Sequence, residues 1–354
     1  AALRAVLKTS LHFLVLGFFL LLFADLEVTV LDPWIELPRI FSGLVTPDLL
    51  SLWSMRVALL NTLIFALCGI ALAIAMGIPL AFAFSLAPVR MGCAVVRAVH
   101  EIFWAFIFLP IVGLNPICGV FAIAVPYAGI FAKVFAEIRQ ESDQRPIRAL
   151  PIGADWFSRF CYGVFPIVTR SLRNYTAYRF ECALRSSAVL GFIGLPTLGF
   201  QLETAFREGN YSEAAAILYL FYMLILSLKV WLKPKLVPIW LAGAFVLLAK
   251  DVSFRWENVI RFGREILPWP MRREGFAAGT DALKLAPAET YAWLQSLFQN
   301  QGIHGLWNTL VLTQIALAVT GLVAVFTFPV VCRHFSGRPT RSLGNLLLVV
   351  LRTT

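Results

Sequence analysis

Residues 57–87 decide the fold class, because they read VALLNTLIFALCGIALAIAMGIPLAFAFSLA and contain no charged side chain. A helix rises 1.5 Å per residue and needs about 20 apolar residues to cross some 30 Å of hydrocarbon. Of the 354 residues, 59% are hydrophobic and 14% are charged, whereas an ordinary globular domain carries about 25% charged residues. The sequence therefore predicts an integral membrane protein and not a soluble enzyme.

Similar apolar runs recur along the chain and give about nine segments, from which we predict an all-helical, polytopic membrane bundle. The last run stops at Thr354 after too few residues to cross a bilayer, and the first residue is Ala1 instead of Met. We therefore expect the sequence to be a fragment. The other runs are residues 11–23, 98–114, 117–135, 178–195, 214–232, 236–249, 306–331 and 343–351.

The net charge of +10 comes from Lys and Arg that lie at the ends of the apolar runs. We therefore expect membrane lipid, and no nucleic acid, as a partner. Basic residues gather in every second connecting segment, which places the N-terminus and loop 139–173 in the cytoplasm. The segments 25–48 and 251–303 belong outside, and we expect short amphipathic surface helices in the second. The basic clusters are Arg4/Lys8, Arg90/Arg97, 139–173, Lys229/Lys233/Lys235 and Arg333/Arg338/Arg341.

Motifs of catalysis and cofactor binding are missing from the sequence. The six cysteines lie far apart without a CxxC pair, so we expect neither a disulfide framework nor a metal site. There is no phosphate-binding loop of the GxxxxGK[ST] type, no GxSxG elbow and no HExxH site. We therefore expect no catalytic residue and no cofactor, and any ATP hydrolysis must occur on a separate subunit.

An internal repeat is visible near both ends of the chain. Residues 60–63, Leu-Asn-Thr-Leu, are followed by a helix rich in small residues, and residues 307–310, Trp-Asn-Thr-Leu, by a similar helix. We predict a first core of about six transmembrane helices at 1–235 and the beginning of a second, similar core at 236–354. A chance match between two apolar stretches is the alternative.

Loop 139–173 is amphipathic, with aromatic residues among arginines. We expect a short helix, a turn at Gly153 and a second helix stopped by Pro166, forming a compact knob that docks on a soluble partner. This pattern resembles the coupling loop of ABC importer permeases, in which Gly and Pro have the spacing of Gly153 and Pro166, although Ile147 stands where that family has Glu. The resemblance implies that ATPase subunits contact Arg148, Ala149, Gly153, Phe165 and Pro166; an ordinary connector is the alternative.

The next segment, Tyr178-Arg179-Phe-Glu181-Cys-Ala-Leu-Arg185 and onward to Gly191-Phe-Ile-Gly194, resembles the phosphonate/phosphite branch of those permeases. The likeness covers about residues 61–232, and residues 195–197, Leu-Pro-Thr, depart from the usual Ala-Gly-Gly. Glu181 and Arg185 share one helix face at the start of a span, where ionisable groups are costly unless paired or facing water. They form either a self-satisfied ion pair or the lining of an anion path. The residues assigned to that path are Arg179, Glu181, Arg185, Gly191 and Gly194.

The resemblance implies a permease subunit in a bacterial inner membrane that moves a phosphonate or related phosphorus oxyanion by alternating access. An extracytoplasmic substrate-binding protein would deliver the solute, and two ABC ATPase subunits would drive the cycle. A fused-repeat importer of thiamine or ferric iron is one alternative, and an ATP-independent carrier or channel is another. His100 and Glu101, at the start of a span, could relay protons, but a capping pair at the membrane interface is favoured.

Overall fold

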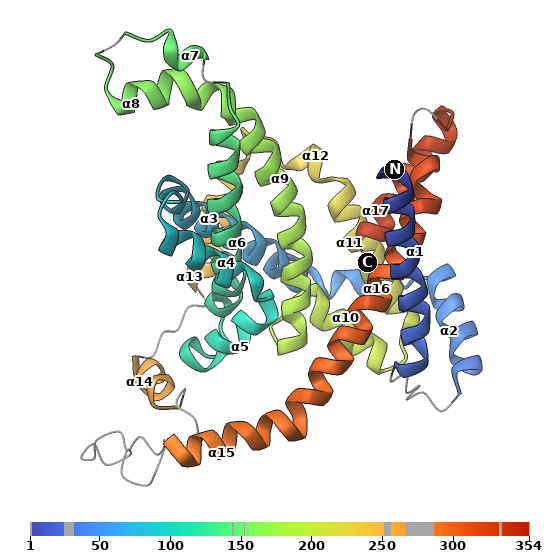
Figure 1. Ribbon diagram of the computed structural model, residues 1–354. Coiled ribbons are helices and arrows are strands. Elements are labelled where there is room, and N and C mark those ends of the chain that lie inside the picture. Colours follow the sequence, from blue (N-terminus) through green and yellow to red (C-terminus); the bar gives the residue numbers. More distant parts are fainter. Residues whose placement is uncertain are drawn as a thin grey trace. The chain divides into compact units, whose positions relative to one another are not determined.

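The computed structural model describes residues 2–24, 32–143, 145–151, 153–250, 256–265, 287–332 and 335–353. Within these ranges all regular structure is helical, as the sequence predicts (Figure 1). Contacts divide the chain into two compact units. The larger unit is Glu36–Phe262, and the smaller one combines Ala1–Ile35 with Gly263–Thr354.

The larger unit contains two helices long and apolar enough to cross a membrane, α3 (Arg56–Phe82) and α6 (Pro116–Gln140). Each predicted apolar run falls on one or more helices, which confirms the helical membrane class. The remaining long helices of this unit are α2 (Pro33–Val45), α4 (Ala87–Ala98), α5 (Glu101–Val112), α9 (Phe165–Val189), α10 (Leu198–Arg207), α11 (Tyr211–Leu226) and α13 (Val237–Lys250).

Two pairs of helices in the larger unit are sharply bent at a short break. Helices α4 and α5 meet at 94°, and the helix that includes α9 meets α10 at 52°. The predicted span 98–114 corresponds to α5 alone, which is too short to cross a bilayer without α4. The break arises because Val99 and His100 have extended backbones and His100 caps the new helix.

Helices α3 and α6 pack closely because two glycines remove side chains from their interface. A Cβ at Gly69 would lie 2.9 Å from Ile123 Cγ2, and one at Gly77 would lie 2.8 Å from Phe131 Cβ. In lipid, where no hydrophobic effect drives helices together, such small residues allow the dispersion contacts that hold them. These two glycines therefore allow α3 and α6 to approach each other closely.

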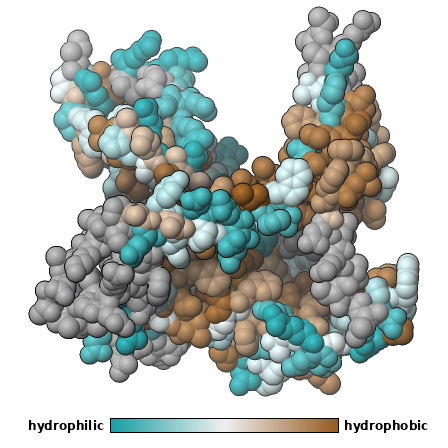
Figure 2. All heavy atoms as spheres, turned by 60° about the horizontal axis from the view of Figure 1, so that its bottom comes forward, coloured by the Kyte–Doolittle hydropathy of each residue, from teal (hydrophilic) through white to brown (hydrophobic). Residues whose placement is uncertain are grey.

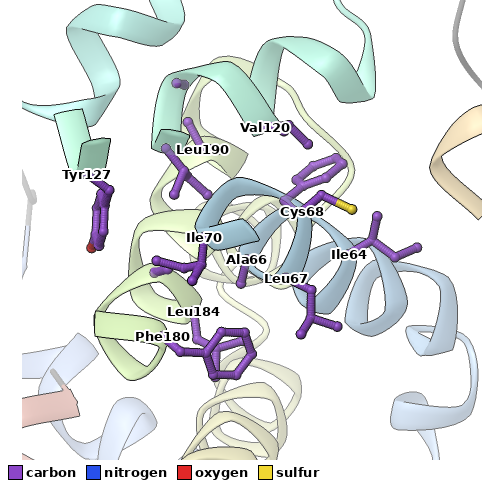
Figure 3. Close-up of a cluster of buried hydrophobic side chains, with 14 of the residues drawn as sticks. Ile64, Ala66, Leu67, Cys68, Ile70, Val120, Tyr127, Phe180, Leu184 and Leu190 are labelled. Carbon is purple, nitrogen blue, oxygen red and sulfur yellow. The ribbon is translucent and has the colours of Figure 1, made fainter. Parts of the chain in front are cut away.

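A buried cluster joins α3 and α6 to α9 (Figure 3). Phe65, Ile123 and Leu184 each have a relative exposure of 1% or less. The labelled side chains in Figure 3 come from α3, α6 and α9 or directly follow α9. This cluster fixes α9, and with it the polar residues that α9 carries, against the two long helices.

The connection from α9 to α10 is a tight turn held by polar residues of α3. Gly194 has φ +91°, a conformation that favours glycine. Asn61 Nδ2 donates to the Pro196 carbonyl over 2.9 Å, and the Leu198 N–H donates to Thr62 Oγ1 over 3.0 Å. The polar pair in the first copy of the predicted repeat therefore anchors this turn.

The smaller unit contains α1 (Ala2–Leu20), α15 (Pro287–Leu297), α16 (Ile303–Val331) and α17 (Arg338–Thr353). Helix α1 packs against α16 where Gly17 meets Ala318. The run 288–331 is the third stretch long and apolar enough to cross a membrane. Helix α14 (Trp256–Glu265) is a short helix within the predicted outer segment, of which residues 251–255 and 266–286 lie outside the described ranges.

Large apolar side chains cover much of the surface, as the brown areas of Figure 2 show. Trp34 and Leu50 are more than 80% exposed, and residues of this kind continue along α3, α5 and α16. Soluble monomers rarely expose contiguous apolar patches of more than a few hundred Å². The surface and the apolar helices together identify a membrane protein.

Candidate functional site

A chain of hydrogen bonds crosses the interior of the larger unit from α5 to α6. His100 Nε2 lies 3.2 Å from Glu101 Oε2, and Glu101 Oε1 accepts from Ser186 Oγ over 3.0 Å. Ser186 Oγ also lies 3.2 Å from Tyr127 Oη. Tyr127 and Ser186 are buried, whereas the His100 side chain is 59% exposed. The chain therefore joins the surface at the α4–α5 break to the buried centre of α6.

His100 also caps α5, because its Nδ1 accepts from the Ile102 N–H over 3.3 Å. A ring nitrogen that accepts is unprotonated, so the hydrogen of neutral His100 sits on Nε2 and points to the Glu101 carboxylate. The capping interpretation from the sequence is thereby confirmed. The same geometry also links the cap to the interior through Glu101.

Arg179 of α9 is enclosed by three tyrosines. Its Nε donates to Tyr175 Oη over 2.7 Å, and its guanidinium carbon lies 5.3 Å from the Tyr175 ring centroid, 5.5 Å from that of Tyr178 and 5.9 Å from that of Tyr127. Cations are attracted to aromatic faces within about 6 Å. The tyrosines hold the partly buried guanidinium against the helix bundle, and Tyr127 connects it to the hydrogen-bonded chain of Ser186 and Glu101.

The other predicted path residues lie along α9 and directly after it. Arg185 Nη2 donates to Glu181 over 3.2 Å, so these two residues form the ion pair that the sequence suggested. Gly191 lies where α9 changes to a 3-10 turn, and its α-carbon is so close to the Phe200 N–H that no Cβ would fit. Gly194 closes the turn by donating to the Gly191 carbonyl over 2.9 Å.

The predicted knob lies at the ends of α6 and α9 (Figure 1). Helix α7 (Arg145–Arg148) is followed by Ala149, a turn at Gly153, and α8 (Trp156–Ser158). The prediction that Pro166 stops the second helix is wrong. Residues 159–164 widen into a π-helix that runs directly into α9, in which Pro166 occupies the first turn. Proline is tolerated there because the N–H that it lacks is not required by the first turn.

Aromatic residues of the knob both attach it to α3 and form part of its surface. Trp156 and Phe160 pack on Phe82 at the end of α3, with ring centroids 5.5 Å and 5.2 Å away. Trp156, Phe157 and Tyr162 are all more than 60% exposed. The contacts with Phe82 therefore tie the knob to the end of α3, while much of its aromatic surface stays uncovered.

Asp155 starts the second helix of the knob by capping it. Its Oδ2 accepts from the N–H groups of Phe157 and Ser158 over 3.1 and 3.3 Å. Hydrogen bonds from the Ser158 side chain and then from these backbone groups lower the pKa of the Asp155 carboxyl below its ordinary value. The capping carboxylate therefore stays ionised at neutral pH.

The chain is similar in sequence to known transport permeases. The chain is 31% identical over 154 residues to the phosphate-import permease protein PhnE of Mycolicibacterium smegmatis, and 30% identical over 177 residues to the phosphite transport system permease protein PtxC of Stutzerimonas stutzeri. It is 28% identical over 105 residues to PhnE2 of Escherichia coli, whose name describes a cryptic phosphonate transport system permease protein. Each of these relatives is named as a transport permease.

These alignments with transport permeases are partial. The first covers 42% of this chain and 29% of the relative, the second 47% and 64%, and the third 29% and 86%. The chain thus spans less than two thirds of the first two permease relatives. No family model matches the chain, and no solved structure matches it.

Sequence reasoning missed three residues of the site: Tyr127, Tyr175 and Ser186. Each is a polar residue in a long helix, and neither position nor composition shows which partner it meets. The available signal was the polarity of Tyr127 within an otherwise apolar run, because buried hydroxyls in membranes need partners. Together with Arg179 and Glu101, these residues form a connected set of polar groups on α5, α6 and α9.

Proposed function

We propose that the chain is the permease subunit of an ABC importer for phosphonate, phosphite or a related phosphorus oxyanion. The observation that carries this proposal is the partly buried Arg179 guanidinium, held by three tyrosines among the apolar helices, in a chain similar to permeases named for phosphate, phosphite and phosphonate. A guanidinium suits such cargo because its planar fork can give two hydrogen bonds to one oxyanion.

In this proposal α9 lines the substrate path with Arg179, Glu181 and Arg185, and Gly191 and Gly194 form its end. An oxyanion would be bound only transiently, because the tyrosines and Glu181 already stabilise the two arginines and so compete with the anion. A site that must release its cargo needs such balanced affinity. The chain needs no covalent chemistry for this role.

The proposed partners follow from the same assignment. Two ABC ATPase subunits would contact Arg148, Ala149, Gly153, Phe165 and Pro166 on the cytoplasmic side of a bacterial inner membrane, and an extracytoplasmic binding protein would deliver the oxyanion. The N-terminus and the knob would both lie in the cytoplasm. Residues 1–235 would form a first permease core, and residues 236–354 would begin a second.

The direct test is uptake of labelled methylphosphonate into vesicles that contain the chain with the ATPase and binding protein of its own transport system. We expect ATP-dependent uptake that phosphite and phosphate reduce, and that Arg179→Gln lowers at least tenfold. The matched control is Arg207→Gln, because Arg207 is 79% exposed and pairs only with Glu203 in the structure.

Uptake that does not depend on ATP would contradict the importer assignment and favour a carrier or channel. ATP-dependent uptake of thiamine or ferric iron alone would keep the transport machine and replace its cargo. If Arg179→Gln and Arg207→Gln had equal effects, the assigned path would be wrong.

A further inference from the structure

An apolar groove of about 320 Å³ opens between α3, α9 and α13 of the larger unit. Leu67 and Ile70 of α3, Phe180 of α9, and Val237 and Leu241 of α13 line it. Figure 3 shows Leu67 and Ile70 projecting from α3 on the side where Phe180 lies. The volume is within the range of small-molecule sites, about 300–1,000 Å³, and the walls offer almost no hydrogen-bonding group.

One basic residue lines this groove, and two more adjoin a lining residue in the sequence. Arg173 and Thr176 of α9 are the polar members of its lining, and Pro234 in the turn before α13 lies between Lys233 and Lys235. All three basic residues are exposed. In the part of the chain that the structure describes, none of the three takes part in an ion pair.

Two tryptophans flank the same turn. The Trp231 indole packs edge-on against Trp240, with ring centroids 5.8 Å apart, and against Phe180 of the groove wall at 6.1 Å. Trp240 Nε1 donates to the Trp231 carbonyl over 3.2 Å. Tryptophans concentrate at the level of lipid headgroups, where one edge of the ring is wet and the other apolar. The groove rim therefore has the composition of a membrane–water interface.

We propose that this groove holds one anionic phospholipid, with an acyl chain along Leu67, Ile70 and Phe180 and the phosphate beside Arg173 and the Lys233/Lys235 pair. The apolar walls favour a ligand that carries an acyl chain over a free phosphate ion, and the basic residues favour a headgroup with net negative charge. Each basic residue near an anionic headgroup contributes about 1 kcal/mol of attraction. This inference does not depend on the transport function proposed above.

The test is native mass spectrometry of the purified chain, released from detergent after incubation with phosphatidylglycerol or with phosphatidylcholine of identical acyl chains. We expect one retained phosphatidylglycerol and little phosphatidylcholine. Arg173→Gln, and separately Lys233→Gln with Lys235→Gln, should each lower retention about fivefold per charge removed. Ala71→Trp, which fills the groove from α3, should abolish it.

Matched controls are Arg90→Gln and Ala94→Trp on α4, because both positions are exposed and neither lines the groove. Thermal unfolding of every variant separates loss of lipid from loss of fold. Unchanged retention in Ala71→Trp, or equal retention of both lipids, would overturn the proposal. Phosphatidylglycerol displaced by millimolar inorganic phosphate, or a dimer that forms only without lipid and covers the groove, would also overturn it.

Discussion

The hydroxyl of Ser186 on α9 donates a hydrogen bond to the carboxylate of Glu101 on α5 over 3.0 Å, between residues 85 positions apart in sequence. Glu101 is the first residue after the sharp break between α4 and α5. Because Ser186 also meets Tyr127 of α6, one buried hydroxyl connects three helices. The position of the broken helix pair is therefore coupled to the helix that carries Arg179.

Replacing Ser186 by Ala should destabilise the fold by about 1–3 kcal/mol, because the buried Tyr127 hydroxyl loses its partner and Glu101 loses a donor. Ser187→Ala is the matched control. Ser187 is more deeply buried than Ser186, but its hydroxyl donates to the Leu184 carbonyl of the same helix. The loss of stability in Ser187→Ala should therefore stay below about 1 kcal/mol. Denaturant titration in detergent measures the free energy of unfolding of both variants. Equal losses of stability would show that Ser186 has no special connecting role.

Replacing Gly77 by Ala should destabilise the α3–α6 interface by about 1–3 kcal/mol, since the new Cβ would lie 2.8 Å from Phe131 Cβ and force the helices apart. The matched change Gly92→Ala, on exposed α4 where a Cβ would meet nothing within 4 Å, should be neutral or stabilise by about 0.5–1 kcal/mol. Thermal unfolding of both variants checks the difference. Equal melting temperatures for Gly77→Ala and the unmodified chain would contradict the packing argument.

The link between α2 and α11 should weaken in acid. Tyr211 Oη donates to Glu36 Oε2 over 2.7 Å, and this hydrogen bond is the largest cause that lowers the pKa of Glu36 below 4.5, followed by attraction to Arg39. A carboxyl with a depressed folded-state pKa stabilises the fold above its unfolded pKa, and this stability is lost as pH falls through the folded value. The pH range over which this stability is lost therefore begins near pH 4.5 and extends below it.

Tyr211→Phe should raise the pKa of Glu36 toward its ordinary value and reduce the loss of stability between about pH 5 and pH 3. Tyr219→Phe is the control, because Tyr219 also joins α11 to α2 but donates to the Leu44 carbonyl, which does not titrate. Unfolding midpoints measured across this pH range distinguish the two. An identical acid response in Tyr211→Phe and the unmodified chain would disprove the linkage.

Changing Gly153 to Asp should abolish ATP-dependent uptake while leaving thermal stability unchanged. A Cβ at Gly153 would meet nothing within 4 Å, and its φ lies outside the left-handed region. The fold therefore tolerates a side chain there, and any loss of transport reports on a partner surface. Uptake and the melting temperature are measured on the same preparation, and full uptake would remove Gly153 from the proposed ATPase contact.

The sequence predicts the helices well, because apolar runs such as 57–87 and 117–135 must become helices in a bilayer whatever they pack against. The internal repeat also draws attention to Asn61 and Thr62, because the same pair recurs at Asn308 and Thr309. Their role as anchors of the 196–198 turn was not predictable, because it depends on a contact across more than 130 residues.

Two features escaped prediction for identifiable physical reasons. The prediction that Pro166 stops a helix was wrong because residues 159–164 form a π-helix that continues into α9, where Pro166 lies in the first α-helical turn. The Tyr127–Ser186 contact was not predicted, because hydropathy indicates which residues are buried but not which side chains they contact. The Glu181–Arg185 pair was visible because four-residue spacing places both side chains on one helix face.

The helix that begins at Trp156 continues without interruption to Ile193, because the π-helix absorbs Pro166. At 1.5 Å per residue, Trp156 and Arg179 are separated by about 35 Å along this helix. If a helix of this length tilts by a few degrees at its aromatic end, the guanidinium moves by about an ångström or more. A partner that pressed on the knob would therefore shift Arg179 and its tyrosine neighbours through a single helix.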